Sequence, residues 1–122
     1  METITINGKE YKFAFNANTS ELFYQVFGED LTRITFDLKD NKMALMEKNR
    51  LPKLAYIANM QAEKSIRELS NRLNVGMYME WLDQFQAGVF ITDADVIRAV
   101  ENGWINSCTA TIKEVKNPTG QQ

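Results

Sequence analysis

Apolar and polar residues alternate along residues 3–15, with the two-residue period of a β-strand. The alternation is interrupted only at Asn7-Gly8, a pair that accepts the positive φ angles of a type I′ turn. This turn would place Ile6 opposite Lys9 and Ile4 opposite Tyr11. Five apolar side chains then share one face, namely Ile4, Ile6, Tyr11, Phe13 and Phe15, while Thr3, Thr5, Glu10 and Lys12 share the other. Since an isolated hairpin is only marginally stable, the apolar face is predicted to pack on helices.

The hairpin is followed by helical periodicity. Asn18, with Glu21 three residues later, fits the capping box of a short helix that Gly28 ends. The apolar residues of this helix are Leu22, Phe23, Val26 and Phe27. Residues 29–41 are ambiguous, because Ile34, Phe36 and Leu38 alternate as in a strand but an extended loop fits equally.

A second helix is expected over Met43–Lys48, and Pro52 suits the first turn of a third. Apolar residues then recur every three or four positions, at Leu51, Ala55, Ala58, Ala62, Ile66, Leu69 and Leu73. This stripe fits one long helix, or two helices with a break near residues 63–65. Asn74 is the expected stop.

The stretch from Val75 to Phe85, VGMYMEWLDQF, is unusually rich in methionine and aromatic residues. At about 100° per residue, Val75, Tyr78, Leu82, Phe85 and Val89 share one helical face, with Trp81 at its edge. This face is predicted to be core. Met77 falls on one flank with Trp81, and Met79 falls on the other. These three residues, Met77, Met79 and Trp81, either pack within a small bundle or form an adaptable patch that binds another protein.

The last predicted helix starts at Thr92, with Asp95 completing its cap, and its apolar side holds Ile97, Val100 and Trp104. Asn102-Gly103 either ends or kinks it, and residues 109–115 favour helix over strand. The fold class is therefore α+β, predominantly α: an N-terminal hairpin on a small bundle of helices. At 122 residues we expect one domain, residues 1–116, followed by a frayed tail, residues 117–122.

Composition narrows the possible chemistry. The chain has no histidine and one cysteine, Cys108, so it lacks the residues for a Cys/His zinc site, for histidine acid–base catalysis or for an intrachain disulfide. Its glycines are scattered, which leaves no phosphate-binding loop. We therefore expect no catalytic residue, no metal, no cofactor and no enzymatic activity. Without a signal peptide or an apolar run long enough to span a bilayer, a cytosolic protein that binds no membrane is expected.

The segment SIRELSNRLNVGMYMEWL has the outline of a helix-turn-helix. A recognition helix needs basic or amide side chains for phosphates and base edges. No Lys or Arg occurs between Arg72 and Arg98, whereas four acidic residues do, and the net charge of the chain is −2. We therefore expect no nucleic acid partner, and a DNA-binding regulator is the least favoured of the functions considered.

The overall layout resembles that of the tail assembly chaperones of long-tailed phages and prophages, particularly those of Gram-positive hosts. The resemblance runs from Met1 to about Val115 and rests on the hairpin ITINGKEYKFAFN, the helix ELFYQVFGEDL and the late helix ITDADVIRAVENGW. It implies a protein of the host bacterial cytoplasm, outside the mature virion, that binds the tape-measure protein, keeps it from aggregating and helps recruit tail-tube subunits. It supplies no binding residues.

The resemblance also implies two translation products, the longer one made by a −1 ribosomal frameshift near the end of the short reading frame. Val115-Lys116-Asn117 can be encoded by GUA AAA AAC, which contains the slippery run A-AAA-AAC. Possible further partners are thus the frameshift-extended form and other copies of the chain. The alternative function is a structural tail or head-tail joining component, which would remain in purified particles.

Overall fold

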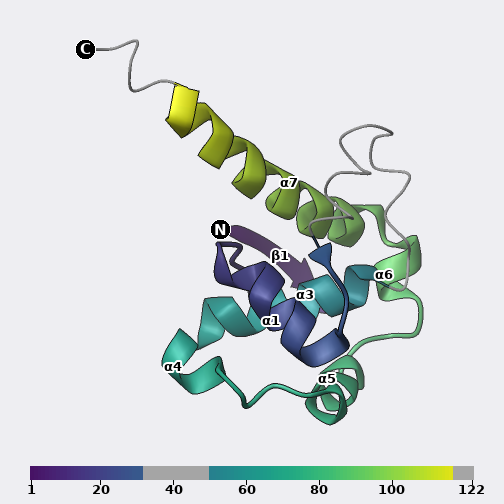
Figure 1. Cartoon of the computed structure of the whole chain (residues 1–122). Helices are drawn as coiled ribbons and strands as arrows, with labels where there is room; N and C mark the ends of the chain where they lie inside the picture. The colour runs from purple at the N-terminus through teal and green to yellow at the C-terminus, as the bar shows by residue number, and fades with distance from the viewer. Residues whose placement is uncertain (32–49, 117–122) are drawn as a thin grey trace.

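The computed structural model describes residues 1–31 and 50–116, with side chains as far as Cys108. In chain order the elements are β1 (Glu2–Ile6), β2 (Lys9–Phe13), α1 (Asn18–Phe27), α3 (Arg50–Glu63), α4 (Ile66–Leu69), α5 (Val75–Leu82), α6 (Val89–Thr92) and α7 (Ala94–Lys116). The fold is α+β and predominantly helical with an N-terminal hairpin, as the sequence predicts (Figure 1). The segment Ile34–Leu38, for which the sequence leaves strand and extended loop both open, the expected helix Met43–Lys48 and the tail 117–122 lie outside the described residues.

The hairpin has the predicted register. Ile6 pairs with Lys9 and Ile4 with Tyr11, in an antiparallel ladder. Asn7 and Gly8 have φ angles of 54° and 80°, which is the left-handed region that a type I′ turn requires. Ile6, Tyr11 and Phe13 are buried, whereas the side chains of the opposite face are exposed. The alternation of the sequence therefore sets which face of the hairpin enters the core.

The hairpin lies between α3 and α7, with β2 against α3 and β1 against α7 (Figure 1). The backbone N–H of Ala14 donates to the carbonyl of Ala58 (3.0 Å), and Ser107 Oγ donates to the carbonyl of Phe15 (3.4 Å). Gly103 sits where α7 approaches the hairpin most closely: a Cβ there would lie 2.4 Å from Phe15 Cε2. Gly103 therefore neither ends nor breaks α7 but permits this contact.

Two predicted helix starts are displaced by two residues or fewer. Asn16, not Asn18, supplies the side-chain cap of α1, since its Oδ1 accepts the Asn18 N–H (2.8 Å). Asp93, not Thr92, caps α7, because its Oδ1 accepts the N–H groups of Asp95 (3.0 Å) and Val96 (3.2 Å). In both cases the cap is an Asx side chain, two residues before the selected position in α1 and one residue after it in α7.

The apolar stripe of residues 51–73 forms two helices, not one. The N–H of Lys64 donates to Met60 O (2.9 Å) at the end of α3, and the N–H of Ser65 donates to Glu68 Oε1 (2.9 Å) at the start of α4. Asn74 was expected to stop a helix but starts one: its Oδ1 accepts the Met77 N–H (2.9 Å). Pro52 lies in the first turn of α3, as predicted, and α7 stays helical through residues 109–115.

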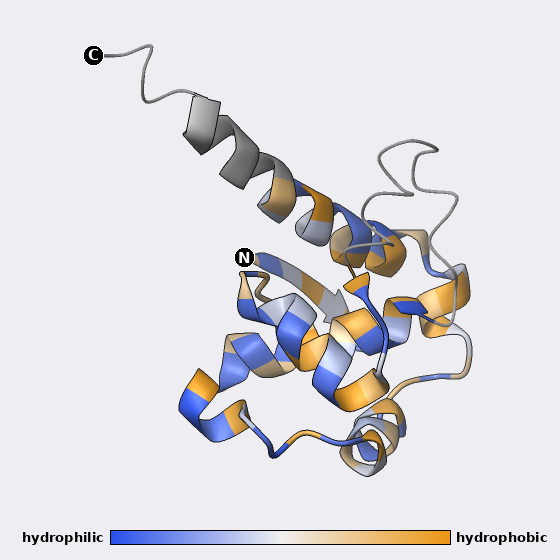
Figure 2. Ribbon diagram, viewed as in Figure 1, coloured by the Kyte–Doolittle hydropathy of each residue, from blue (hydrophilic) through white to orange (hydrophobic). Residues whose placement is uncertain are grey.

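Hydropathy colouring shows apolar positions recurring along α1, α3 and α7 (Figure 2). The core that they form with the hairpin centres on α3, where five consecutive residues from Leu54 to Ala58 are buried. Cys108 is half-buried and packs against this core.

Candidate partner-binding surface

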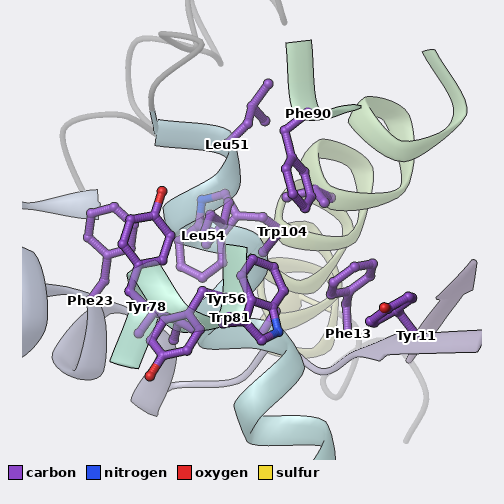
Figure 3. Close-up of a cluster of buried hydrophobic side chains, with 14 of the residues drawn as sticks. Tyr11, Phe13, Phe23, Leu51, Leu54, Tyr56, Tyr78, Trp81, Phe90 and Trp104 are labelled. Carbon is purple, nitrogen blue, oxygen red and sulfur yellow. The ribbon is translucent and has the colours of Figure 1, made fainter. Parts of the chain in front are cut away.

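Trp81 is a core residue. Its relative exposure is 8%, and its indole Nε1 donates to Asn59 Oδ1 (3.0 Å) within the protein. Its ring lies 4.8 Å from that of Phe85, 5.5 Å from that of Tyr56 and 5.7 Å from that of Phe90, between centroids (Figure 3). The prediction of Trp81 as a partner-binding residue is therefore wrong, and the packing alternative holds for it.

Asn59 connects this aromatic cluster to the hairpin. It is 5% exposed, and its amide makes two hydrogen bonds: Oδ1 accepts from Trp81, and Nδ2 donates to the carbonyl of Lys12 (2.9 Å). One side chain of α3 thus fixes α5 on one side and β2 on the other. The rotation of α5 about its axis is set by this contact, and so is the choice of residues that α5 exposes.

Tyr78 faces inward on the same helix. Its ring packs against Phe27 and Tyr56, at centroid distances of 5.0 Å and 5.5 Å. Burial raises the pKa of the Tyr78 hydroxyl to about 12, so the group stays neutral at physiological pH. Tyr56 is 1% exposed, and its hydroxyl has no hydrogen-bond partner among the described residues. Burial, and then the charge of Glu80, raise the pKa of this hydroxyl.

The two methionines of α5 lie on opposite flanks of the helix. Counting about 100° per residue, Tyr78 and Trp81 mark the buried side, and Met77 and Met79 are about 160° apart around the axis. Met77 is 40% exposed and Met79 is 56% exposed. Both are therefore available to a partner, but they do not form one patch.

Met79 belongs to the more apolar of the two flanks. Val75 precedes it by one turn and Leu82 follows it by one turn, so the three side chains form a row along α5. Val75 is 51% exposed, which corrects the prediction that it belongs to the core face. The row leads from the start of α5 to its last residue.

The chain turns sharply after Leu82. The N–H groups of Gln84 and Phe85 donate to the carbonyls of Trp81 (3.4 Å) and Leu82 (3.0 Å), which tightens the end of α5. Tyr11 Oη donates to Gln84 Oε1 (2.8 Å) and ties this turn to the hairpin. Gly88, with φ at 84°, then starts α6. Phe85 and Val89 consequently lie beyond α5, although the sequence placed them on its face.

A pocket of about 240 Å³ opens where α5, α6 and the first turn of α3 meet. Its lining is mostly apolar: Pro52, Leu82, Phe85, Gln86, Ala87, Gly88, Val89, Phe90 and Ile91. Ile91 is 47% exposed. We call this pocket, together with the row Val75, Met79 and Leu82, the α5–α6 surface. Sequence periodicity missed the pocket because it extended the helical face through Phe85 to Val89, although Gly88 was a signal of a break.

Among the described residues near the pocket, the cations are paired with a carboxylate, whereas two other carboxylates are not paired. Arg50 and Lys53, next to Pro52, both bind Glu29, with Nε–Oε1 at 3.0 Å and Nζ–Oε2 at 2.9 Å. Asp83 follows Leu82 and Asp93 follows Ile91 by two residues, and neither forms an ion pair within the described part of the chain. Among the described residues beside the pocket, the unpaired charges are therefore negative.

Residues 1–31 and 50–108 hold no group of three or more Cys, Asp and Glu side chains that could bind a metal ion. None of the helices in the described ranges has the length and apolar character needed to cross a membrane. Comparison with protein-family models, with curated proteins and with solved structures found no match.

Proposed function

We propose that this protein is a tail assembly chaperone of a long-tailed phage or prophage, which binds the tape-measure protein, keeps it soluble and helps recruit tail-tube subunits in the host cytoplasm. Two observations support the proposal: the layout of the sequence, and the apolar α5–α6 surface. The second carries more weight, because exposed apolar side chains beside a pocket are typical of a surface that another protein covers.

The composition of the surface suits a chaperone. Methionine is flexible and polarisable, so Met79 adapts to partner side chains of different shapes. The neighbouring row and pocket add aliphatic and aromatic contacts on a scaffold held by the buried Asn59–Trp81 bond. Holding a partner in this way requires reversible burial of apolar area and no catalytic group.

Co-expression with the tape-measure protein encoded beside this gene tests the proposal. We expect the tape-measure protein to stay soluble and to co-purify only when this chain is present. The double variant Val75→Ser, Met79→Ser removes apolar contacts from the surface, and it should reduce the soluble fraction. Tyr24→Ser, Ile66→Ser is the matched control, because these two residues are similarly exposed, at 62% and 47%, on other helices. Trp81→Ala is unsuitable here, since it would damage the core.

Solubility of the tape-measure protein that is the same with and without this chain would contradict the chaperone role. Recovery of this chain in purified particles would instead favour the structural tail or head-tail joining component. Equal loss in both double variants would show that the α5–α6 surface is not the binding site. A single Met77→Ser variant asks separately whether the opposite flank of α5 contributes.

A further inference from the structure

We infer that the pocket of the α5–α6 surface receives an apolar side chain from an amphipathic helix of the partner protein whose flanking residues are lysine or arginine. The inference rests on the proposed function in that it takes the partner to be a protein. It adds the chemistry of the partner segment: helical, apolar on one side and basic beside that side.

The size of the pocket favours a side chain over a small molecule. Its volume of about 240 Å³ is below the roughly 300–1,000 Å³ of most ligand pockets. Among the described lining residues Gln86 is the one whose side chain is not apolar, so this part of the lining lacks the convergent polar groups that orient a cofactor. An apolar anchor that enters from a larger protein surface matches both properties.

Backbone hydrogen bonding favours a helical partner. The N–H groups of Phe85, Val89 and Ile91 all donate within the turn and α6, to the carbonyls of Leu82, Gln86 and Gly88. The described elements beside the pocket are helices, so within residues 1–31 and 50–116 no strand edge is present there to pair with an extended peptide. A partner that satisfies its own main-chain groups, as an amphipathic helix does, can bury side chains here without leaving unpaired polar groups.

Charge favours basic flanks on that helix. Among the described residues, the cations on either side of Pro52, Arg50 and Lys53, are both held by Glu29, at 3.0 Å and 2.9 Å. Asp83 is exposed next to the pocket. Asp93 Oδ1 accepts two backbone N–H groups, which leave its negative charge in place. A lysine or arginine placed beside the anchor would meet these carboxylates, whereas a glutamate would be repelled.

Two synthetic amphipathic peptides provide the test: one of leucine, alanine and lysine, and one with glutamate in place of every lysine. Binding to the wild-type chain is measured by fluorescence anisotropy at low salt, and the site is mapped by amide chemical-shift changes. We expect the lysine peptide to bind at least about tenfold more tightly and to perturb the amides of residues 82–91. Added salt should weaken its binding.

Ile91→Lys and Ile66→Lys form a matched pair. Both residues are 47% exposed isoleucines, and both variants change the net charge equally, but only Ile91 lines the pocket. We expect Ile91→Lys to weaken the lysine peptide about tenfold and Ile66→Lys to change it by less than about twofold. Equal effects of the two variants, or equal binding of the two peptides, would overturn the inference. A wild-type dimer that Ile91→Lys dissociates would also overturn it, since the pocket would then hold a second copy.

The two proposals fail separately. If the chain solubilises the tape-measure protein and Ile91→Lys solubilises it equally well, the pocket inference is wrong while the chaperone role stands. If the lysine peptide binds at the pocket but the tape-measure protein is insoluble with or without the chain, the docking site stands and the chaperone role is wrong.

Discussion

Asn59→Ala should be the most informative substitution, because one buried amide joins three elements. The change removes the acceptor of the Trp81 indole N–H and the donor to the Lys12 carbonyl. The indole N–H is buried, and leaving such a donor unpaired costs about 1–3 kcal/mol. The Lys12 carbonyl is only partly buried, so water can replace its lost donor and the cost there is nearer about 1 kcal/mol. Together these terms predict a loss of about 2–4 kcal/mol in the free energy of unfolding.

Urea unfolding followed by far-UV circular dichroism measures this loss. With a slope typical of small domains, the midpoint should fall by about 1–2 M. Trp81→Phe keeps an aromatic ring but removes the indole N–H. In that background Asn59→Ala leaves no buried donor unpaired, so its cost in the free energy of unfolding should be at least about 1 kcal/mol smaller. Additive effects of the two substitutions, or a loss below about 1 kcal/mol for Asn59→Ala alone, would refute the idea that this hydrogen bond orients α5.

Four further substitutions probe the fold. Gly103→Ala should lower the free energy of unfolding by about 1–2 kcal/mol in a thermal or urea melt, because the new methyl group would overlap the Phe15 ring and this clash outweighs the gain in helix propensity. Gly76→Ala is the control: its Cβ would lie 3.2 Å from the end of a cap side chain, so it should cost less than about 0.5 kcal/mol or stabilise the fold. Tyr56→Phe should be neutral or stabilise by up to about 1 kcal/mol, because it deletes a buried hydroxyl that has no hydrogen-bond partner among the described residues. A clear loss of stability would instead show that the hydroxyl makes a stabilising contact. Burial raises the pKa of the Glu101 carboxyl, so folding favours its protonated form. The protonated carboxyl therefore stabilises the fold fully below the unfolded pKa, near 4.5, and this stabilisation is lost as pH rises through the folded pKa. Glu101→Gln should therefore be more stable than wild type at neutral pH and lose that advantage below about pH 4; an advantage independent of pH would point to packing instead.

The features that the sequence predicts well are those set by near neighbours. The hairpin register follows from Asn7-Gly8 and the alternation beside it, and the inward direction of Tyr78 follows from helical spacing. Gly28 ends α1 with a φ of 69°, as its position suggests. In each case the controlling residues lie within a few positions of one another.

What the sequence leaves open depends on contacts between distant residues. Trp81 stands at the edge of a predicted face, and its burial depends on contacts with distant residues, such as the hydrogen bond to Asn59, 22 residues away, and the ring of Tyr56. The pocket likewise needs Pro52 of α3 to meet the turn after Leu82. Neither contact produces a periodic pattern in the sequence. Helical spacing therefore locates Met77 and Met79 on α5, but it does not predict the α5–α6 surface.

The position of the hairpin between α3 and α7 also has a consequence for how the chain folds as it is synthesised. The hydrogen bond from Ser107 to the Phe15 carbonyl spans 92 residues, so the apolar face of the hairpin is finally covered only after α7 has been made. At translation rates of about 5–20 residues per second, that interval is roughly 5–20 s. During it, β1 and β2 leave the ribosome as an incomplete unit that exposes apolar side chains and strand edges. Truncation before α7 should therefore yield an aggregation-prone fragment, and the last helix acts as the step that completes the fold.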